Sequence, residues 1–183
     1  MRTDRLQDEY DIRIRYRFFP LHPETPDEGL TLEELFAGRN IDVRKSQAEM
    51  TQRMADEGLP YGERTMTYNS RLAQELAKWA ETQPGGDGFI LSVYQAYFVD
   101  GRNIGETDVL IDLVKQCGLP ADEARNVLET RSFRDAVDRD WLQARSMGLT
   151  GVPAFAAGQS GVMGAQPYEV LEQLIRRAGA ERR

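Results

Sequence analysis

The spacing of apolar residues changes twice along this 183-residue chain, and that order restricts the fold more than any other feature. Residues 11–19 alternate apolar side chains with arginines, which predicts a half-buried strand near a sheet edge. Helical spacing then continues over 31–147. Two short apolar runs within 153–163 predict a β-hairpin, and 168–178 predicts a helix that begins at Pro167 as its first residue. The sequence therefore predicts an α/β fold with a large helical insertion.

The helical block contains its own boundary signals. Thr31 and Glu34 form a capping box that predicts a short helix through Phe36. Further helices are predicted over 43–57, from a cap at Asn69 or Ser70, over 89–98, over 107–117, and over 120–147 with a break near 131–132. The segment 89–98 is apolar on nearly every side, so we expect that helix to be fully buried.

Composition excludes several functions. A net charge of −7 argues against nucleic acid and anionic membranes as partners. One cysteine and one histidine exclude a disulfide framework and a metal site rich in those residues. No apolar run reaches the roughly 18 residues that cross a bilayer, and the charged first ten residues contain no signal peptide. We therefore expect a cytoplasmic protein, although a leader could precede a truncated N-terminus.

Four local motifs resemble the DsbA family, specifically its FrnE-like and 2-hydroxychromene-2-carboxylate isomerase-like branches. The similarity extends over nearly the whole chain, from Leu6 to Ala178. The motifs are Phe18-Phe19-Pro20-Leu21-His22-Pro23, Tyr68-Asn69-Ser70-Arg71-Leu72-Ala73, Phe98-Val99-Asp100-Gly101-Arg102-Asn103-Ile104, and Gly148-Leu149-Thr150-Gly151-Val152-Pro153-Ala154-Phe155 followed by Gly164-Ala165-Gln166-Pro167. The last motif is the most specific.

The resemblance implies a thioredoxin-like domain made of residues 1–30 and 148–183, with 31–147 as the inserted helical domain. It also implies a cis peptide bond before Pro153, which leaves the N–H and C=O of Val152 facing outward to pair with a thiol-bearing peptide or glutathione. Gly164, Ala165 and Gln166 would lie beside this edge, at a helix N-terminus suited to a carboxylate. The implied substrate-binding residues are Val152, Pro153, Gly164, Ala165 and Gln166, with His22 and Asn69 as further cleft residues.

The thiol chemistry of the DsbA family depends on a Cys-x-x-Cys pair at the start of the first helix, and this sequence has no such pair. Cys117 does not replace it, because its helical spacing predicts a buried, inert residue in the last turn of a helix. Only ten residues precede Asp11, whereas the missing strand, loop and helix need roughly 25 to 30. Two explanations compete, a truncated start and a degenerate natural chain, and truncation is favoured. Loss of a central strand predicts weak solubility or homo-oligomerisation.

Three functions are consistent with the sequence. The first is a thiol–disulfide oxidoreductase family protein that acts on thiol- or disulfide-bearing proteins or small thiols, and whose present sequence is inactive. The second is a glutathione-dependent isomerase, with glutathione as co-substrate and no other cofactor. The third is a non-catalytic module that binds peptides at the same edge. The residue at the missing helix start, cysteine or serine, would separate the first two.

Overall fold

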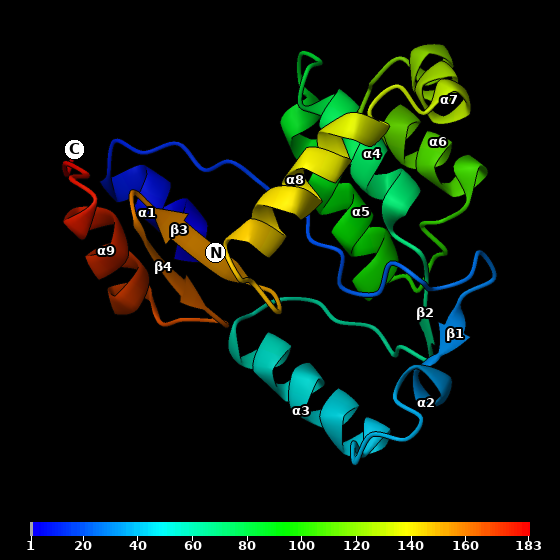
Figure 1. The fold of residues 1–183 in the computed structure, drawn as a ribbon, viewed down its shortest axis with the longest axis horizontal. Coiled ribbons are helices and arrows are strands. Elements are labelled where there is room, and N and C mark those ends of the chain that lie inside the picture. Colours follow the sequence, from blue (N-terminus) through cyan, green and yellow to red (C-terminus); the bar gives the residue numbers. More distant parts are fainter. Residues whose placement is uncertain (1) are drawn as a thin grey trace. The chain divides into compact units, whose positions relative to one another are not determined.

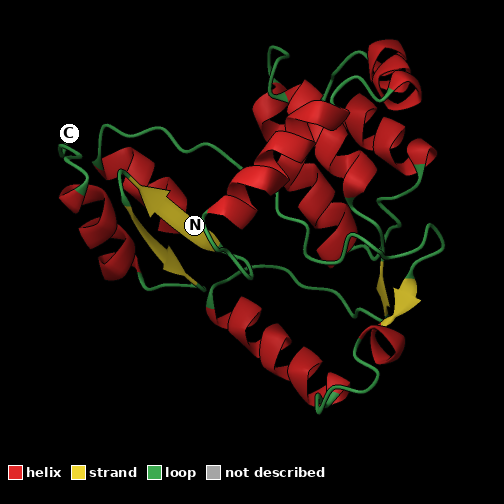
Figure 2. Cartoon of the chain, viewed as in Figure 1, coloured by secondary structure: helices red, strands yellow, loops and turns green. Residues whose placement is uncertain are grey.

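The computed structural model describes residues 2–183, which divide into two compact units. Of the described residues, the first unit contains 2–21 and Arg139–Arg183, and the second contains His22–Asp138. Helix α8 (Arg134–Ser146) begins in the second unit and ends in the first. Figure 2 shows that helices dominate and that the strands form two short sheets.

The first unit is built on the hairpin of β3 (Ala154–Ala157) and β4 (Ser160–Met163), against which α9 (Tyr168–Arg177) packs (Figure 1). The short helix α1 (Arg2–Glu9) contributes Leu6 to the same core. Gly158 has a φ of 58° in the hairpin turn, a backbone conformation that favours glycine. The hairpin and the final helix are confirmed, except that Pro167 is the N-cap residue and not the first helical residue.

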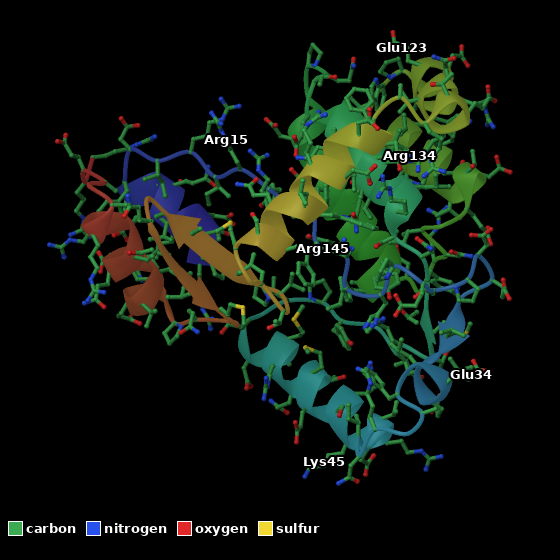
Figure 3. The ribbon with its side chains drawn as sticks, viewed as in Figure 1. Arg15, Glu34, Lys45, Glu123, Arg134 and Arg145 are labelled. Carbon is green, nitrogen blue, oxygen red and sulfur yellow. The ribbon has the colours of Figure 1, made fainter. Side chains whose placement is uncertain are left out.

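Residues 11–19 do not form the predicted strand. They run as an extended segment, which carries Arg15 (Figure 3), and the described sheets contain only the pairs β1–β2 and β3–β4. A strand exists only where a neighbouring backbone supplies N–H and C=O partners. The Phe18 N–H instead donates to the Asp140 carboxylate of α8 at 3.0 Å, and Tyr10 makes an isolated bridge with Arg182. Ile12, Ile14 and Phe18 are partly buried as the alternation predicts, whereas Tyr16 is 43% exposed.

The second unit is mainly helical. Its α-helices are α2 (Leu32–Leu35), α3 (Val43–Asp56), α4 (Arg71–Ala80), α5 (Phe89–Phe98), α6 (Thr107–Gln116), α7 (Ala121–Thr130) and the start of α8, with a 3₁₀ turn at Gly86–Gly88. The Thr31–Glu34 capping box is confirmed, and Glu34 lies on α2 (Figure 3). Arg131, with a φ of 52°, ends α7 and confirms the predicted break. Fully buried Leu76, Phe89 and Leu110 belong to its core.

Two features of this unit differ from the sequence prediction. The first is a short antiparallel pair, β1 (Leu30–Thr31) with β2 (Met66–Thr67), inside the region expected to be helical. Strands of two residues carry no readable period. The second is α5, which is not fully buried, because Leu91 and Tyr94 expose 46% and 47% of their surface. An apolar sequence lowers the cost of burial on every side, but only a neighbouring element can cover each side.

None of the described helices combines the length and the apolar character needed to cross a membrane.

Candidate functional site

The predicted substrate edge lies where β3 begins. The Val152–Pro153 peptide bond is cis, and Val152 is 54% exposed. The Pro153 carbonyl accepts a hydrogen bond from the Gly164 N–H at 2.8 Å, so Pro153 extends the hairpin pairing by one residue. Within the described residues, neither backbone group of Val152 has a hydrogen-bond partner. Unpaired groups at an exposed strand end can receive an extended chain.

The turn between β4 and α9 holds the other three predicted residues beside this edge. Gly164 has a φ of 87°, which favours glycine, and its N–H is the group that bonds to Pro153. The Gln166 side-chain amide donates to the Met163 carbonyl, which orients it within the turn. Sequence and structure therefore bring Val152, Pro153 and Gly164–Gln166 together within one unit.

An arginine that the sequence did not identify lies at the same turn. The Arg2 guanidinium of α1 donates to the Gln166 carbonyl at 2.9 Å, across 164 positions of sequence. This contact adds positive charge near the N-terminus of α9, where the helix dipole already favours an anion. No local motif marks Arg2, because its partner lies in a distant segment.

The helices α1 and α9 are joined through Glu9. Its carboxylate accepts hydrogen bonds from Arg5 at 2.7 Å, from Arg182 at 2.6 Å and from the Tyr168 hydroxyl at 3.0 Å. The hydrogen bond from Arg5, followed by those from Arg182 and Tyr168, lowers the Glu9 pKa to about 2. The Arg5 guanidinium also lies over the Tyr168 ring, with its carbon 3.9 Å from the ring centroid. The contacts of Glu9 with Tyr168 and Arg5 position the start of α9 against α1, and therefore also position the adjoining turn that contains Gln166.

His22 and Asn69 lie in the second unit, where both contact Thr25. The Asn69 side-chain amide donates to the Thr25 carbonyl at 2.7 Å, and the Thr25 hydroxyl donates to the His22 carbonyl at 2.9 Å. Asn69 also accepts the Arg71 N–H at 2.9 Å, which ties the proline-rich loop to the start of α4. Burial lowers the pKa of His22, so the neutral imidazole dominates at neutral pH. These contacts give Asn69 a structural role, whereas its part in a cleft stays a prediction.

Cys117 is the C-cap residue of α6 and is partly exposed, so the expected full burial is wrong. Its sulfur lies 3.2 Å from the Ser92 hydroxyl. Helix α6 ends at Gln116, which leaves Cys117 at a turn rather than inside the apolar face. The residue lies in the second unit, whereas Val152 and Gly164 belong to the first.

A groove of about 270 Å³ lies between β4 and α9 in the first unit. It is lined by Ser160, Gly161, Val162, Val170, Gln173, Leu174 and Arg177. Neither Val152 nor Pro153 borders this groove, so the candidate edge is an exposed backbone surface and not part of that cavity.

Comparisons with known proteins agree with this architecture. The chain is 29% identical to a probable DsbA oxidoreductase from Streptomyces coelicolor, with a TM-score of 0.80 over 89% of this chain and 74% of that one. A candidate protein disulfide isomerase from Nitrosomonas europaea has a TM-score of 0.61 at 15% identity, over 84% and 77% of the two chains, and shows the fold alone. The uncharacterized protein YwbO of Bacillus subtilis is 33% identical over 106 residues, which are 57% of this chain. The chain thus spans about half, 52%, of the length of that curated relative.

The family profile described as a DSBA-like thioredoxin domain matches residues 1–176, which is nearly the whole sequence. This match, together with the structural neighbours, confirms the predicted fold class: a DsbA-like thioredoxin fold that carries a helical insertion. The chain belongs to the family of DsbA-like thioredoxin domains.

Proposed function

We propose that this chain binds an extended thiol- or disulfide-bearing segment at the Val152–Pro153 edge, as the substrate-binding part of thiol–disulfide oxidoreductase chemistry. One observation carries the proposal: Val152 is exposed and both of its backbone groups lack partners within the described residues. An incoming strand would satisfy both groups. The membership of the DsbA-like family supports a thiol or disulfide substrate.

The proposal assigns binding, and not a complete redox cycle, to this sequence. In disulfide exchange a thiolate attacks a disulfide, and a second thiol then resolves the mixed disulfide. The sequence contains one cysteine, Cys117, and therefore lacks the pair that such a cycle needs. We assign the substrate edge to the thioredoxin-like part, residues 1–30 and 148–183, and treat 31–147 as the inserted domain.

The test is an NMR titration of ¹⁵N-labelled protein with an unfolded cysteine-containing peptide. We expect the largest shift changes at the amides of Val152, Ala154 and Gly164. Val152→Pro removes the N–H that would donate to the peptide, and the loss of one hydrogen bond predicts about 2- to 13-fold weaker binding. Unchanged affinity in a folded Val152→Pro variant, or shift changes confined to other segments, would overturn the proposal.

A second candidate is glutathione binding of the kind that a glutathione-dependent isomerase needs. Arg2 favours it, because its guanidinium at the Gln166 carbonyl supplies a cation where a carboxylate of glutathione would lie. Arg2→Ala should weaken the binding of reduced glutathione about two- to fivefold. Arg15→Ala, which removes an exposed arginine of the same unit, is the matched control and should change nothing.

Competition between glutathione and the unfolded peptide for binding to the chain separates the two candidates. If glutathione binds and the unfolded peptide neither binds nor displaces it, the isomerase-type site is favoured. If the peptide binds with or without its thiol blocked, the chain is a peptide-binding module, the third function considered. Thiol-dependent peptide binding supports the oxidoreductase-type substrate edge.

A further inference from the structure

The exposed side of α5 carries a line of large apolar side chains. Leu91, Tyr94 and Phe98 follow one another at spacings of three and four residues, which places them on one face of the helix. Leu91 is 46% exposed and Tyr94 is 47% exposed, while Phe98 is half-buried. Single exposed apolar residues are common in proteins, but a continuous line on one helix face indicates a binding surface.

Ring packing holds this line together. The Phe98 centroid lies 6.0 Å from that of Tyr94, 4.8 Å from that of Tyr97 and 6.5 Å from that of Tyr61. Tyr61 comes from the segment that precedes β2, so two parts of the second unit contribute rings to one cluster. Tyrosine rings offer large contact area with little loss of conformational freedom, which suits them to recognition.

Arg64 gives the cluster a positive charge. Its guanidinium carbon lies 4.5 Å from the Tyr97 ring centroid and 5.1 Å from that of Phe98, and it donates to the Tyr97 hydroxyl at 2.7 Å. The same terminal nitrogen also donates to the Met66 carbonyl at 3.4 Å. Within the described residues no carboxylate forms an ion pair with Arg64, and its Nε is buried without an acceptor. The buried Glu75, in contrast, is paired with two arginines. A guanidinium held against aromatic rings without an acidic partner is suited to bind one from outside.

We propose that the α5 aromatic surface, defined as Tyr61, Arg64, Leu91, Tyr94 and Phe98, binds a polypeptide segment that has an aromatic or branched apolar side chain next to a carboxylate. This inference rests on the proposed function and deepens it by naming the class of substrate polypeptide. The rings and Leu91 take the apolar side chain, and Arg64 takes the carboxylate. A second copy of the chain fits this surface less well, because a two-fold contact brings two Arg64 cations without acidic partners to one interface.

The probe is a fluorescein-labelled peptide without cysteine, Gly-Ser-Phe-Leu-Asp-Gly-Ser-Gly, measured by fluorescence anisotropy against its counterpart with asparagine in place of aspartate. Tyr94→Ser should weaken binding of the aspartate peptide about tenfold. Tyr16→Ser is the matched control, because Tyr16 is a tyrosine of similar exposure, 43%, in the first unit. The affinity of this variant for the aspartate peptide should stay within about twofold of wild type.

Arg64→Gln tests the carboxylate separately. Wild type should prefer the aspartate peptide over the asparagine peptide, and Arg64→Gln should bind the two equally. Circular dichroism of each variant checks that it is folded, and Tyr94→Ser removes an exposed side chain, so folding should be kept. Equal affinity of Tyr94→Ser and Tyr16→Ser overturns the proposal. So does light scattering that shows a dimer of wild type and a monomer of Tyr94→Ser.

The outcome is separable from that of the proposed function. The probe carries no thiol, and Val152→Pro leaves the α5 aromatic surface unchanged. If the cysteine peptide fails to shift Val152 while the probe still depends on Tyr94 and Arg64, the edge proposal fails and the docking proposal stands. If the cysteine peptide shifts Val152 while binding of the probe does not depend on Tyr94 or Arg64, the docking proposal fails and the edge proposal stands.

Discussion

The carboxylate of Glu75 is buried between two arginines of the second unit. Its side chain, on α4, is only 1% exposed and bonds to the Nε of Arg71 at 2.5 Å and to the Nε of Arg131 at 2.7 Å. A second nitrogen of Arg131 donates to the other carboxylate oxygen at 2.8 Å, so that pair is bidentate. Arg71 also bonds to Asp138 of α8 at 2.8 Å. The carboxylate therefore links α4, the end of α7 and, through Arg71, the start of α8.

Glu75→Gln keeps the shape of the side chain and removes its charge. Breaking a buried ion pair costs about 3–5 kcal/mol, because the remaining charge stays buried. Here Arg71 keeps Asp138 and the Arg131 side chain is 42% exposed, so water and a second acid offset part of the loss. We therefore expect a decrease of about 3 kcal/mol in the free energy of unfolding, at the lower end of that range.

The assay is urea unfolding followed by circular dichroism at neutral pH, with an unchanged m-value as evidence that only stability has changed. Glu123→Gln, which alters an exposed glutamate of α7 (Figure 3), is the control and should stay within about 0.5 kcal/mol of wild type. If Glu75→Gln lowers the free energy of unfolding by less than about 1 kcal/mol, the reasoning about the buried ion pair is refuted.

The same substitution has a predicted pH dependence. Burial by itself raises the Glu75 pKa, but hydrogen bonds from Arg131 and Arg71 outweigh it, and the net pKa lies below the ordinary value of 4.5. A pKa that is lower in the folded state stabilises the protein above the unfolded-state pKa, and this contribution is lost as the pH falls through the folded-state value. The stability gap between wild type and Glu75→Gln should therefore narrow on acidification.

Three further predictions concern other parts of the chain. Glu9→Gln should lower the Tm at neutral pH. Because the Glu9 pKa is lowered from 4.5 to about 2 in the folded protein, the Tm difference between wild type and Glu9→Gln should vanish as the pH falls from 4.5 towards about 2. A Tm difference that does not change with pH contradicts this prediction. Cys117→Ser should leave any insulin-reduction activity of the chain unchanged, and activity lost in that variant would assign Cys117 a redox role. Gly86→Ala should lower the free energy of unfolding in urea by about 1–3 kcal/mol, because the added Cβ would lie 1.8 Å from the Ala80 carbonyl oxygen. Gly88→Ala, whose Cβ would meet open space, should lower it less. Equal losses of stability in the two variants would contradict the predicted clash.

Most elements of this fold could be predicted because their signals are local. The Thr31–Glu34 capping box lies within four residues, and the break at Arg131 interrupts a readable helical period. The hairpin and the edge at Val152–Pro153 were likewise predicted from adjacent residues, through spacing and through resemblance to the DsbA family. The resulting site residues lie together because Gly164 pairs with Pro153 as the hairpin requires.

By itself, the sequence determined the helix limits, the hairpin and the family to which the chain belongs. Only the tertiary structure decided that residues 11–19 have no ladder, that one face of α5 stays exposed, and that Arg2 meets Gln166. The physical reason is the range of the interactions. Caps and turns are completed by residues a few positions apart, whereas a strand partner, a covered helix face or a contact across 164 positions depends on where the whole chain runs.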